Sequence, residues 1–366
     1  MDTTDTAITF DEKGVCDHCR TYKEAIQPFW NPTKHNEKKI ESLVSKIKKS
    51  SKGKDHDCII GMSGGIDSSY LVYLAKEKLN LNPLVFHVDA SWNSNEAVHN
   101  IEVIVEKLGL NLFTEVINWE EMKDLQLSYF KSGVSNIDTL QDHAFFATMY
   151  KFASKYKIKY ILTGGNFSTE CVRNPIEWMY YQSDSIQLKD IHKKFGSKPL
   201  KEFPISHILW HKFYLPYIKK IKLVRPLDYM VYNKEEAKQT LVEKFNYKPY
   251  PQKHFESRFT KFYESYWLPK KFGYDTRKVQ FSSLILTEQM TRTEALEKLK
   301  EPSYDINTID HDFEYIANKL DITVEELKGY LNNENKTYKD YKNQMWFYNF
   351  GAEVLKKLGI EKGGKR

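Results

Sequence analysis

The residues best suited to chemistry lie together in one glycine-rich stretch, Ser63-Gly64-Gly65-Ile66-Asp67-Ser68. Gly64 and Gly65 have no Cβ, so their backbone can approach an anion closely. The serine hydroxyls, with that of Ser69, can donate hydrogen bonds to oxygen atoms. Asp67 cannot bind phosphate directly, so we expect it to cap the turn or to act through Mg²⁺. The stretch therefore predicts a phosphate-binding loop.

A strand and a helix should hold this loop. The apolar residues 58–60 are typical of a buried parallel strand, and residues 70–75 follow a helical pattern. The amino end of a helix carries unpaired N–H groups and a partial positive charge, which favours anions. No Gly-Lys-Ser/Thr follows the glycines, so the loop is not a Walker A motif. The alternative is a glycine turn that merely joins strand to helix in another α/β protein.

Strands and helices alternate along the chain, which predicts an α/β fold with a doubly wound, mostly parallel sheet. We expect further strands at 83–89, 112–116 and 160–165, and helices at 68–79, 95–108, 142–156 and 234–245. Ligands of such sheets bind at the carboxyl ends of the strands. The loop, Val88 and Gly164-Gly165 should therefore converge on a nucleotide, with adenine near Val88 and Gly164. The alternative for the two glycines is a simple turn at a strand end.

The same pattern divides the chain into three regions. Residues 1–40 are a polar segment, residues 41–250 form the nucleotide-binding domain, and residues 251–366 are predicted to be a helical C-terminal region. Residues 167–225 break the strand–helix rhythm. We interpret them as an insertion that helps to form an acceptor pocket, with an ordinary aromatic packing module as the alternative.

The composition fits a globular enzyme. The chain has 366 residues, 41% of them hydrophobic and 14% aromatic, which argues against disorder. A net charge of +6, spread along the chain, suits a phosphate-bearing ligand and is not the concentrated stripe of a nucleic-acid binder. There is no signal peptide or apolar run of 18 residues, and four cysteines imply no disulfide framework. We expect a soluble, cytoplasmic protein without nucleic-acid or membrane partners.

Cations near residue 255 are candidates for a catalytic role. Lys253, Arg258 and Lys261 would lie near one another if a helix begins around His254. Cations beside the phosphate loop could neutralise a leaving pyrophosphate, so we predict that Lys253 and Arg258 contact phosphate. A solvated basic face is the alternative.

Cys16 and Cys19 form a single C-x-x-C pair. Structural zinc needs four ligands, so one pair is weak evidence for a metal. A redox pair is the other interpretation, but no thioredoxin-like strand precedes it.

Several of these segments together resemble one family. The loop resembles that of the PP-loop ATP pyrophosphatases, which hold the pyrophosphate of ATP. Residues 8–16, 163–166 and 253–260 resemble segments of the N-acetyl sugar amidotransferases, which act in bacterial surface-polysaccharide (lipopolysaccharide, O-antigen) and nonulosonic-acid biosynthesis. The resemblance covers nearly the whole chain. The loop is specific only to the superfamily, and residues 250–275 are the more specific mark.

This resemblance implies a reaction, cofactors and partners. ATP and Mg²⁺ would serve to adenylate the acetamido oxygen of a nucleotide-linked N-acetyl sugar, and ammonia would displace AMP to leave an acetamidino group. A glutaminase and a cyclase-like subunit would supply the ammonia. We expect the catalytic residues to be Ser63, Asp67, Lys253 and Arg258. The expected nucleotide-binding residues are Met62, Ser63, Gly64, Gly65, Asp67, Ser68, Ser69, Val88, Gly164 and Gly165.

The resemblance also bears on the cysteine pair. In the family, another C-x-x-C lies upstream of a segment like residues 1–5, and Cys16 and Cys19 would be the second pair. We therefore expect an incomplete zinc site here, with weak or absent zinc and a mobile segment before about residue 20. His35 or Cys171 could complete it only if the fold brings them near.

Two other functions compete with this prediction. One is a tRNA-modifying PP-loop enzyme, either a thiolase or a lysidine-type ligase. Thiolation usually needs paired cysteines or an iron–sulfur cluster, and Cys171 has no evident mate. The other is an inactive nucleotide-binding scaffold, against which the intact loop argues.

Overall fold

The computed structural model describes residues 1–357 and is built on a five-stranded, all-parallel sheet in the order β3-β2-β1-β4-β5. The central strand β1 pairs with β2 on one side and β4 on the other, so Ile59 lies opposite both Leu84 and Ile161. The predicted α/β, doubly wound fold is confirmed. The strands are β1 (Ile59–Gly61), β2 (Leu84–Asp89), β3 (Asn111–Val116), β4 (Tyr160–Leu162) and β5 (Lys222–Val224).

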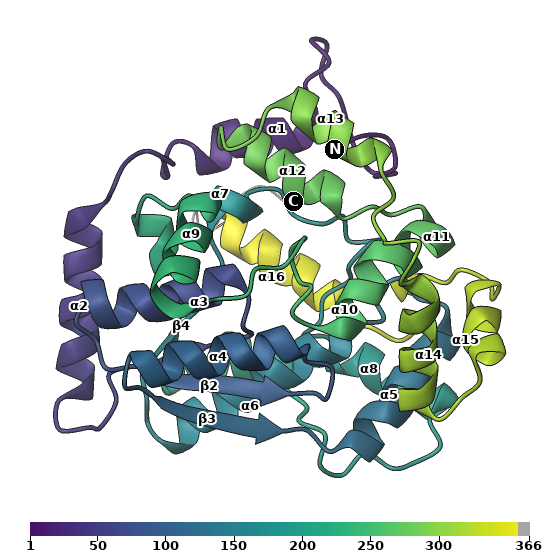
Figure 1. Ribbon diagram of the computed structural model, residues 1–366, viewed down its shortest axis with the longest axis horizontal. Helices are drawn as coiled ribbons and strands as arrows, with labels where there is room; N and C mark the ends of the chain where they lie inside the picture. The colour runs from purple at the N-terminus through teal and green to yellow at the C-terminus, as the bar shows by residue number, and fades with distance from the viewer. Residues whose placement is uncertain (358–366) are drawn as a thin grey trace.

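Helices cover both faces of the sheet because successive side chains of a strand point in opposite directions. Cys58 and Ile60 pack in one core with α3, α4 and α9, whereas Ile59 and Ile161 pack in another with α6. Figure 1 shows α4 and α6 flanking β2 and β3. The helices of this half are α2 (Glu37–Ser51), α3 (Ile66–Tyr73), the π-helical η2 (Leu74–Lys78), α4 (Asn95–Lys107), α5 (Trp119–Ser132), α6 (Thr139–Lys155) and α9 (Lys234–Phe245).

Residues 167–225 do more than cover the strand ends. They supply β5, which completes the sheet beside β4, and α8, which packs against α5. Neither β5 nor α5 is among the predicted elements. The remaining elements of this stretch and the turn after it are α7 (Phe167–Glu170), α8 (Ser185–Phe195), the π-helical η3 (Trp210–Ile218) and the 3₁₀ helix η4 (Pro226–Tyr229).

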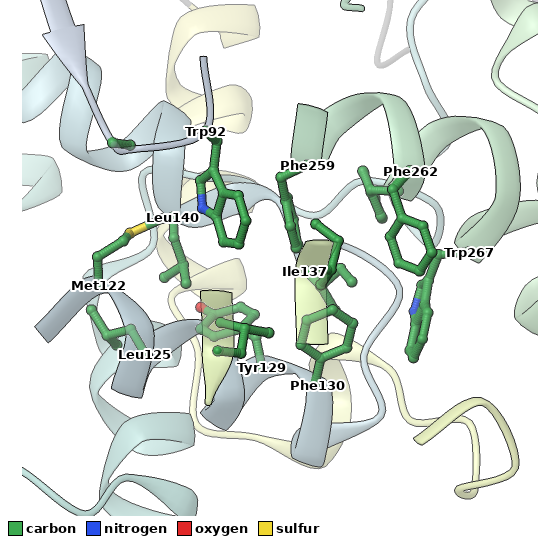
Figure 2. Close-up of a cluster of buried hydrophobic side chains, with 14 of the residues drawn as sticks. Trp92, Met122, Leu125, Tyr129, Phe130, Ile137, Leu140, Phe259, Phe262 and Trp267 are labelled. Carbon is green, nitrogen blue, oxygen red and sulfur yellow. The ribbon is translucent and has the colours of Figure 1, made fainter. Parts of the chain in front are cut away.

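The described C-terminal region is helical and shares a core with the rest of the chain (Figure 2). The ring of Phe130 on α5 lies 4.7 Å from that of Trp267, and Trp92, just beyond β2, lies 5.0 Å from Phe259. This aromatic core fixes the segment before α10 over the strand ends. The elements are α10 (Arg258–Phe262), η5 (Tyr263–Trp267), α11 (Leu268–Phe272), α12 (Arg277–Leu286), α13 (Arg292–Lys300), α14 (Ile309–Leu320), α15 (Val324–Leu331), η6 (Tyr338–Asp340) and α16 (Met345–Lys357).

The N-terminal segment, with α1 (Asp17–Thr21) and the π-helical η1 (Tyr22–Ile26), lies beside α12 (Figure 1). The amino group of Met1 donates a hydrogen bond to Ser282 Oγ at 2.6 Å, and Lys278 forms an ion pair with Asp2 at 2.7 Å. Across residues 1–357, no helix combines the length and the apolar character needed to cross a bilayer.

Candidate active site

The glycine-rich loop leads from β1 directly into α3, and its serines hold its shape. The Gly65 N–H donates to Ser63 Oγ at 3.3 Å, and the Ser63 N–H donates to Ser68 Oγ at the same distance. Gly64 adopts a left-handed φ of +84°, and a Cβ there would lie 2.8 Å from the carbonyl oxygen of Ala97. Only glycine suits this position, because L side chains rarely adopt that conformation and no space exists for one.

The end of β4 approaches the same loop closely. A Cβ on Gly164 would lie 2.7 Å from the carbonyl carbon of Asp67 and from the nitrogen of Ser68. In the sheet, β1 lies between β2 and β4. From β1 the chain crosses to β2 on one side, whereas from β4 it crosses to β5 on the other side. A crevice forms at such a switch in strand order, and α/β proteins bind ligands there. The predicted convergence of the loop with the end of β4 is therefore present in the structure.

Asp67 lies within a network of charges and hydroxyls. The Tyr232 hydroxyl donates to Asp67 Oδ1, and Lys253 Nζ lies 3.7 Å from Asp67 Oδ2 and 2.5 Å from Glu170 Oε1. Burial lowers the pKa of Lys253, but the charges of Glu170 and Asp67 outweigh it and raise that pKa. Lys253 is therefore a fixed cation beside the loop.

A carboxylate already rests on the loop. Ser63 Oγ donates to Glu256 Oε1 at 3.1 Å, and a Cβ on Gly65 would lie 2.6 Å from the same oxygen. The carboxylate oxygen of Glu256 thus stands where the sequence predicts a phosphate oxygen. The loop has the shape and donors to hold an anion, and an incoming phosphate must displace Glu256 or share the site with it through a cation.

The loop lines a cavity of about 680 Å³. Its walls come from the ends of β1, β2 and β4, the start of α6, residues 170–182, the start of α9, and residues 250–264, which run through α10 into η5. Of the predicted residues, the cavity is lined by Met62, Ser63, Gly65, Asp67, Ser68, Val88, Gly164, Gly165 and Lys253.

The predicted residues Gly64, Ser69 and Arg258 do not line this cavity. Gly64 faces Ala97, and Ser69 is fully buried in α3. The Arg258 guanidinium lies 3.4 Å from the centre of the Tyr315 ring and 3.9 Å from Asp312. The structure therefore places Arg258 beside Tyr315 and outside the cavity, so it does not bring this side chain to the loop.

The position of Arg258 has a local cause. The helix begins at Arg258 rather than around His254, because residues 256–258 pair with residues 92–94 in an extended bridge. The Ser94 N–H donates to the Glu256 carbonyl, and the Arg258 N–H donates to the Trp92 carbonyl, both at 2.8 Å. This pairing separates Lys253 from Arg258.

Acidic groups gather in the part of the cavity lined by α6 and η5. Glu264 accepts a hydrogen bond from His254 Nδ1 at 2.9 Å. Burial lowers the pKa of His254, but Glu264 outweighs it and raises that pKa to about 9. Asp142 reaches the cavity from α6, and its side chain is exposed there without a hydrogen-bond partner among residues 1–357. Desolvation by the cavity walls raises its pKa to about 6. Asp138 accepts from Thr260 Oγ1 at 2.8 Å, and burial raises its pKa well above the usual value.

His87 on β2 supports the base of the loop. Its Nδ1 lies 2.9 Å from the Met62 carbonyl oxygen, and its Nε2 lies 3.0 Å from the amide nitrogen of Asn93. Burial lowers the pKa of His87, which favours the neutral ring. A neutral ring that donates from Nδ1 and accepts at Nε2 satisfies both contacts.

Several cavity residues are absent from the sequence-based prediction. The most important are His87, Asp138, Asp142, Glu170, Lys234, His254, Glu256 and Glu264. His254 and Glu256 lie within the segment that carries the family resemblance, so that segment was the available signal. Asp138, Asp142 and Lys234 occur in ordinary helical patterns, and only the fold brings them to the loop.

Cys16 and Cys19 lie side by side, with their sulfur atoms 3.4 Å apart. His18 between them is paired with Asp5 at 2.8 Å. Within residues 1–357, no group of three or more His, Cys, Asp or Glu side chains is arranged to hold a metal ion. The structure gives no support to a zinc site.

The cavity fits a nucleoside triphosphate. Gly65 leaves an oxygen-sized space beside the amino end of α3, and Lys253 and Lys234 line the walls near Asp67. Proteins usually bind Mg²⁺ through one or two carboxylates together with substrate phosphates. Asp67 is the carboxylate placed for that role, and the ion would neutralise phosphate charge.

Comparison with known families agrees with this site. Residues 36–202 match the NAD synthase family, which covers the loop and four of the five strands. With the fold and the cavity, this match defines an ATP-utilising enzyme of the PP-loop class.

A second match is more specific. Residues 256–358 match the C-terminal domain of WbpG-like proteins of lipopolysaccharide biosynthesis. The two matches together confirm the resemblance to the N-acetyl sugar amidotransferase family.

Individual relatives match only in part. An uncharacterized protein of Methanocaldococcus jannaschii is 29% identical over 157 residues, 43% of this chain and 53% of its own length. The tRNA-specific 2-thiouridylase MnmA 2 of Fusobacterium nucleatum is 29% identical over 120 residues, 31% of this chain and 34% of its own length. The chain thus spans about half and a third of these two curated relatives.

Similar solved structures include two synthetases. The NH3-dependent NAD synthetase of Campylobacter jejuni has a TM-score of 0.34 at 13% identity, over 82% of this chain and 97% of that one. The NMN synthetase of Francisella tularensis has a TM-score of 0.36 at 15% identity, over 78% of this chain and 96% of that one. The U34-tRNA thiolase NcsA of Methanococcus maripaludis has a TM-score of 0.33 at 15% identity, over 77% and 80%.

Proposed function

We propose that this protein is an ATP-dependent amidotransferase that converts the acetamido group of a nucleotide-linked sugar into an acetamidino group. One observation carries the proposal: a single cavity joins the PP-loop to residues 250–264, where the match to the WbpG-like domain begins. A phosphate-binding loop and a family-specific wall therefore face the same substrate space.

The proposed reaction has two steps. The acetamido oxygen attacks the α-phosphorus of ATP, and the bond to pyrophosphate breaks. Ammonia then adds to the activated carbon, the C–O bond breaks, and AMP leaves with the former amide oxygen. The added nitrogen loses a proton to give the amidine. The net products are the acetamidino sugar, AMP and pyrophosphate.

Cations and hydroxyls of the chain suit the first step. Lys253 is held as a cation beside the loop by Glu170 and Asp67. It would balance the charge that develops on the leaving pyrophosphate, which is the type of stabilisation that contributes most in many enzymes. Ser63 and the amino end of α3 would hold the phosphate oxygens after Glu256 moves aside.

Asp142 suits the second step, because the added nitrogen must lose a proton. Its carboxylate is exposed to the cavity, and desolvation by the cavity walls raises its pKa to about 6. A general base works best when its pKa lies near the working pH. We assign proton removal to Asp142, with the His254–Glu264 pair beside it as a fixed source of charge.

Ammonia would come from a glutaminase and a cyclase-like subunit. No cysteine lines the cavity within residues 1–357, and Cys58 and Cys171 are buried. Ammonium salt should therefore support the reaction of the purified chain. Glutamine alone should not, and glutamine-dependent turnover by this chain alone would count against the partner assignment.

The decisive experiment measures AMP and pyrophosphate while nucleotide-linked N-acetyl sugars are supplied one at a time with ATP, Mg²⁺ and ammonium. Mass spectrometry of the sugar should show that oxygen has been replaced by NH. Ser63→Ala is the control, since it should bind sugar without forming AMP. Stoichiometric ADP and phosphate, or AMP release that no sugar stimulates, would refute the proposal.

The alternative, a tRNA-modifying enzyme, draws on the match to the 2-thiouridylase. That match covers a third of the relative, and nucleotide-binding regions recur with different chemistries. Burial raises the pKa of Cys171 to about 11, which disfavours a thiolate nucleophile. Transfer of sulfur to tRNA by the purified chain would favour this alternative.

A further inference from the structure

An exposed apolar strip lies on η3 and continues onto β5. Phe213, Tyr217 and Ile218 are 58%, 66% and 59% exposed, and Leu223 is 45% exposed. The rings of Phe213 and Tyr217 contact each other at 5.5 Å, so they form one surface. Tyr156, at the end of α6, is 50% exposed. Large apolar side chains gathered on a surface commonly mark a site of interaction.

Lysines collect beside this strip, at the amino ends of three strands. Lys157 precedes β4 and Lys220 precedes β5, each in a turn with a φ of +56°. Lys159 Nζ donates to the Lys219 carbonyl at 2.7 Å, and Lys54, before β1, donates to the Lys157 carbonyl at 2.8 Å. The cluster is completed by Lys155 and Lys222.

Acidic residues are few beside this cluster, and those nearest in sequence are Asp55 and Asp57, which follow Lys54 before β1. Residues 143–169 and 203–227 contain no aspartate or glutamate. Among residues 1–357, none of the seven lysines 54, 155, 157, 159, 219, 220 and 222 forms an ion pair with a carboxylate. Their mutual repulsion contributes to a lowered pKa of Lys159, after the larger effect of burial. We call the apolar strip and the seven lysines the basal face.

We propose that the basal face binds the surface of a bilayer that contains anionic phospholipid. Aromatic and aliphatic side chains that enter the headgroup region, surrounded by cations that attract anionic lipid, are the features that hold peripheral proteins on membranes. The inference goes beyond the proposed function and does not depend on it. It differs from the expectation, drawn from the sequence, of a chain with no membrane partner.

Other partners fit these residues less well. All seven cations are lysine, and lysine is depleted at protein–protein interfaces, whereas arginine is enriched there and in nucleic-acid recognition. A second copy of the chain would bring two such lysine clusters together across a symmetric contact. RNA binding would not account for the exposed apolar side chains of Ile218 and Leu223.

The position of the basal face is compatible with catalysis. The lysines lie at the amino ends of β1, β4 and β5, whereas the phosphate loop lies at their carboxyl ends. The amino ends and the carboxyl ends of parallel strands lie at opposite ends of the sheet. The cavity therefore stays open to substrate while the basal face rests on a bilayer.

The test is co-sedimentation of the full chain with vesicles of phosphatidylglycerol and phosphatidylethanolamine, compared with neutral phosphatidylcholine vesicles. We expect binding to the anionic vesicles only, and weaker binding as salt is raised. Two variants separate the contributions. One is Tyr217→Ser with Ile218→Ser. The other is Lys157→Asn with Lys220→Asn, which retains residues that tolerate a positive φ.

Each double variant should bind anionic vesicles at least about tenfold more weakly, since the burial of apolar side chains and the attraction of lysines to anionic lipid both contribute to binding. The matched control is Leu296→Ser with Lys298→Gln on α13, far from the sheet (Figure 1), which should bind as the parent chain does. If the serine double variant fails to fold, the asparagine double variant still tests whether the basal face binds anionic vesicles. The proposal is overturned by no binding to anionic vesicles, by equal binding to neutral ones, or by unchanged binding of both variants. It is also overturned if the variants lose instead a contact with tRNA or a concentration-dependent dimer.

Discussion

Gly164→Ala should weaken ATP binding through the backbone of the loop, without removing any group that contacts phosphate. The added Cβ would lie 2.7 Å from two backbone atoms, the Asp67 carbonyl carbon and the Ser68 nitrogen. Gly164 is not in a left-handed conformation, so alanine can adopt its backbone. Any effect therefore comes from the contact itself.

The size of the effect follows from that contact. Carbon atoms pack at about 3.5–4.0 Å, so the start of α3 or the end of β4 must move by about 1 Å. Overpacking of this kind costs about 1–3 kcal/mol. A 1 Å displacement at a site can cost on the order of 100-fold in rate. We expect ATP affinity to fall about 10- to 100-fold, because 1.4 kcal/mol corresponds to tenfold.

Calorimetric titration with ATP and Mg²⁺ measures this directly and needs no sugar. Gly329→Ala on α15 is the matched control, because a Cβ there meets no atom within 4 Å. It should leave ATP affinity unchanged and stabilise the helix by about 0.5–1 kcal/mol. If Gly164→Ala binds ATP as the parent chain does, the close approach of β4 to the loop is not part of the nucleotide site.

Ser63→Ala should lower AMP formation by two or more orders of magnitude, on the order of 3 kcal/mol, with an unchanged melting temperature; near-parental turnover would exclude a catalytic loop. Asp142→Asn should slow the ammonium-dependent rate on the order of 100-fold and remove a rise in rate through about pH 6, where the carboxyl ionises, and a retained rise would assign the base elsewhere. His254→Asn should flatten a pH dependence of unfolding. A histidine with a folded pKa of about 9 stabilises fully below about pH 6.5, and this contribution is lost as the pH rises through 9. Equal slopes for both proteins in denaturant titrations over that range would contradict the His254–Glu264 pair. Arg258→Lys should lower the free energy of unfolding by about 0.5–1 kcal/mol through loss of its contact with Tyr315, while the affinity for ATP stays the same; weaker ATP binding would return Arg258 to the site.

The order of strands and helices could be predicted as far as it depends on local patterns. The apolar run before the loop and the helical pattern after it predict β1 and α3, and the structure has both. Strand β5 escaped prediction because it has only three residues, and its Lys222 and Leu223 are exposed at the sheet edge. Helix α5 was not predicted either, although Asn118 caps it and apolar residues recur along it.

The site was predictable where one short segment supplies it. The loop and Gly164 come from strand ends, so their convergence follows from the sheet alone. Glu256 and Asp142 lie far from the loop in sequence. Glu256 lies in the segment that resembles the family, whereas Asp142 carries no local signal. Arg258 is the clearest example of a position that the sequence could not predict. A helix that began around His254 would place its side chain near Lys253, but the bridge between residues 92–94 and 256–258 directs it toward Tyr315 instead.

The contacts that complete the cavity join distant parts of the chain. Ser63 and Glu256 are separated by 193 residues, and Asp67 and Tyr232 by 165. The cavity is therefore complete only once residues 232–264 have packed over the strand ends. A nucleotide held between the loop and these walls would stabilise the closed arrangement against unfolding of either part, because a ligand stabilises the states that bind it most tightly.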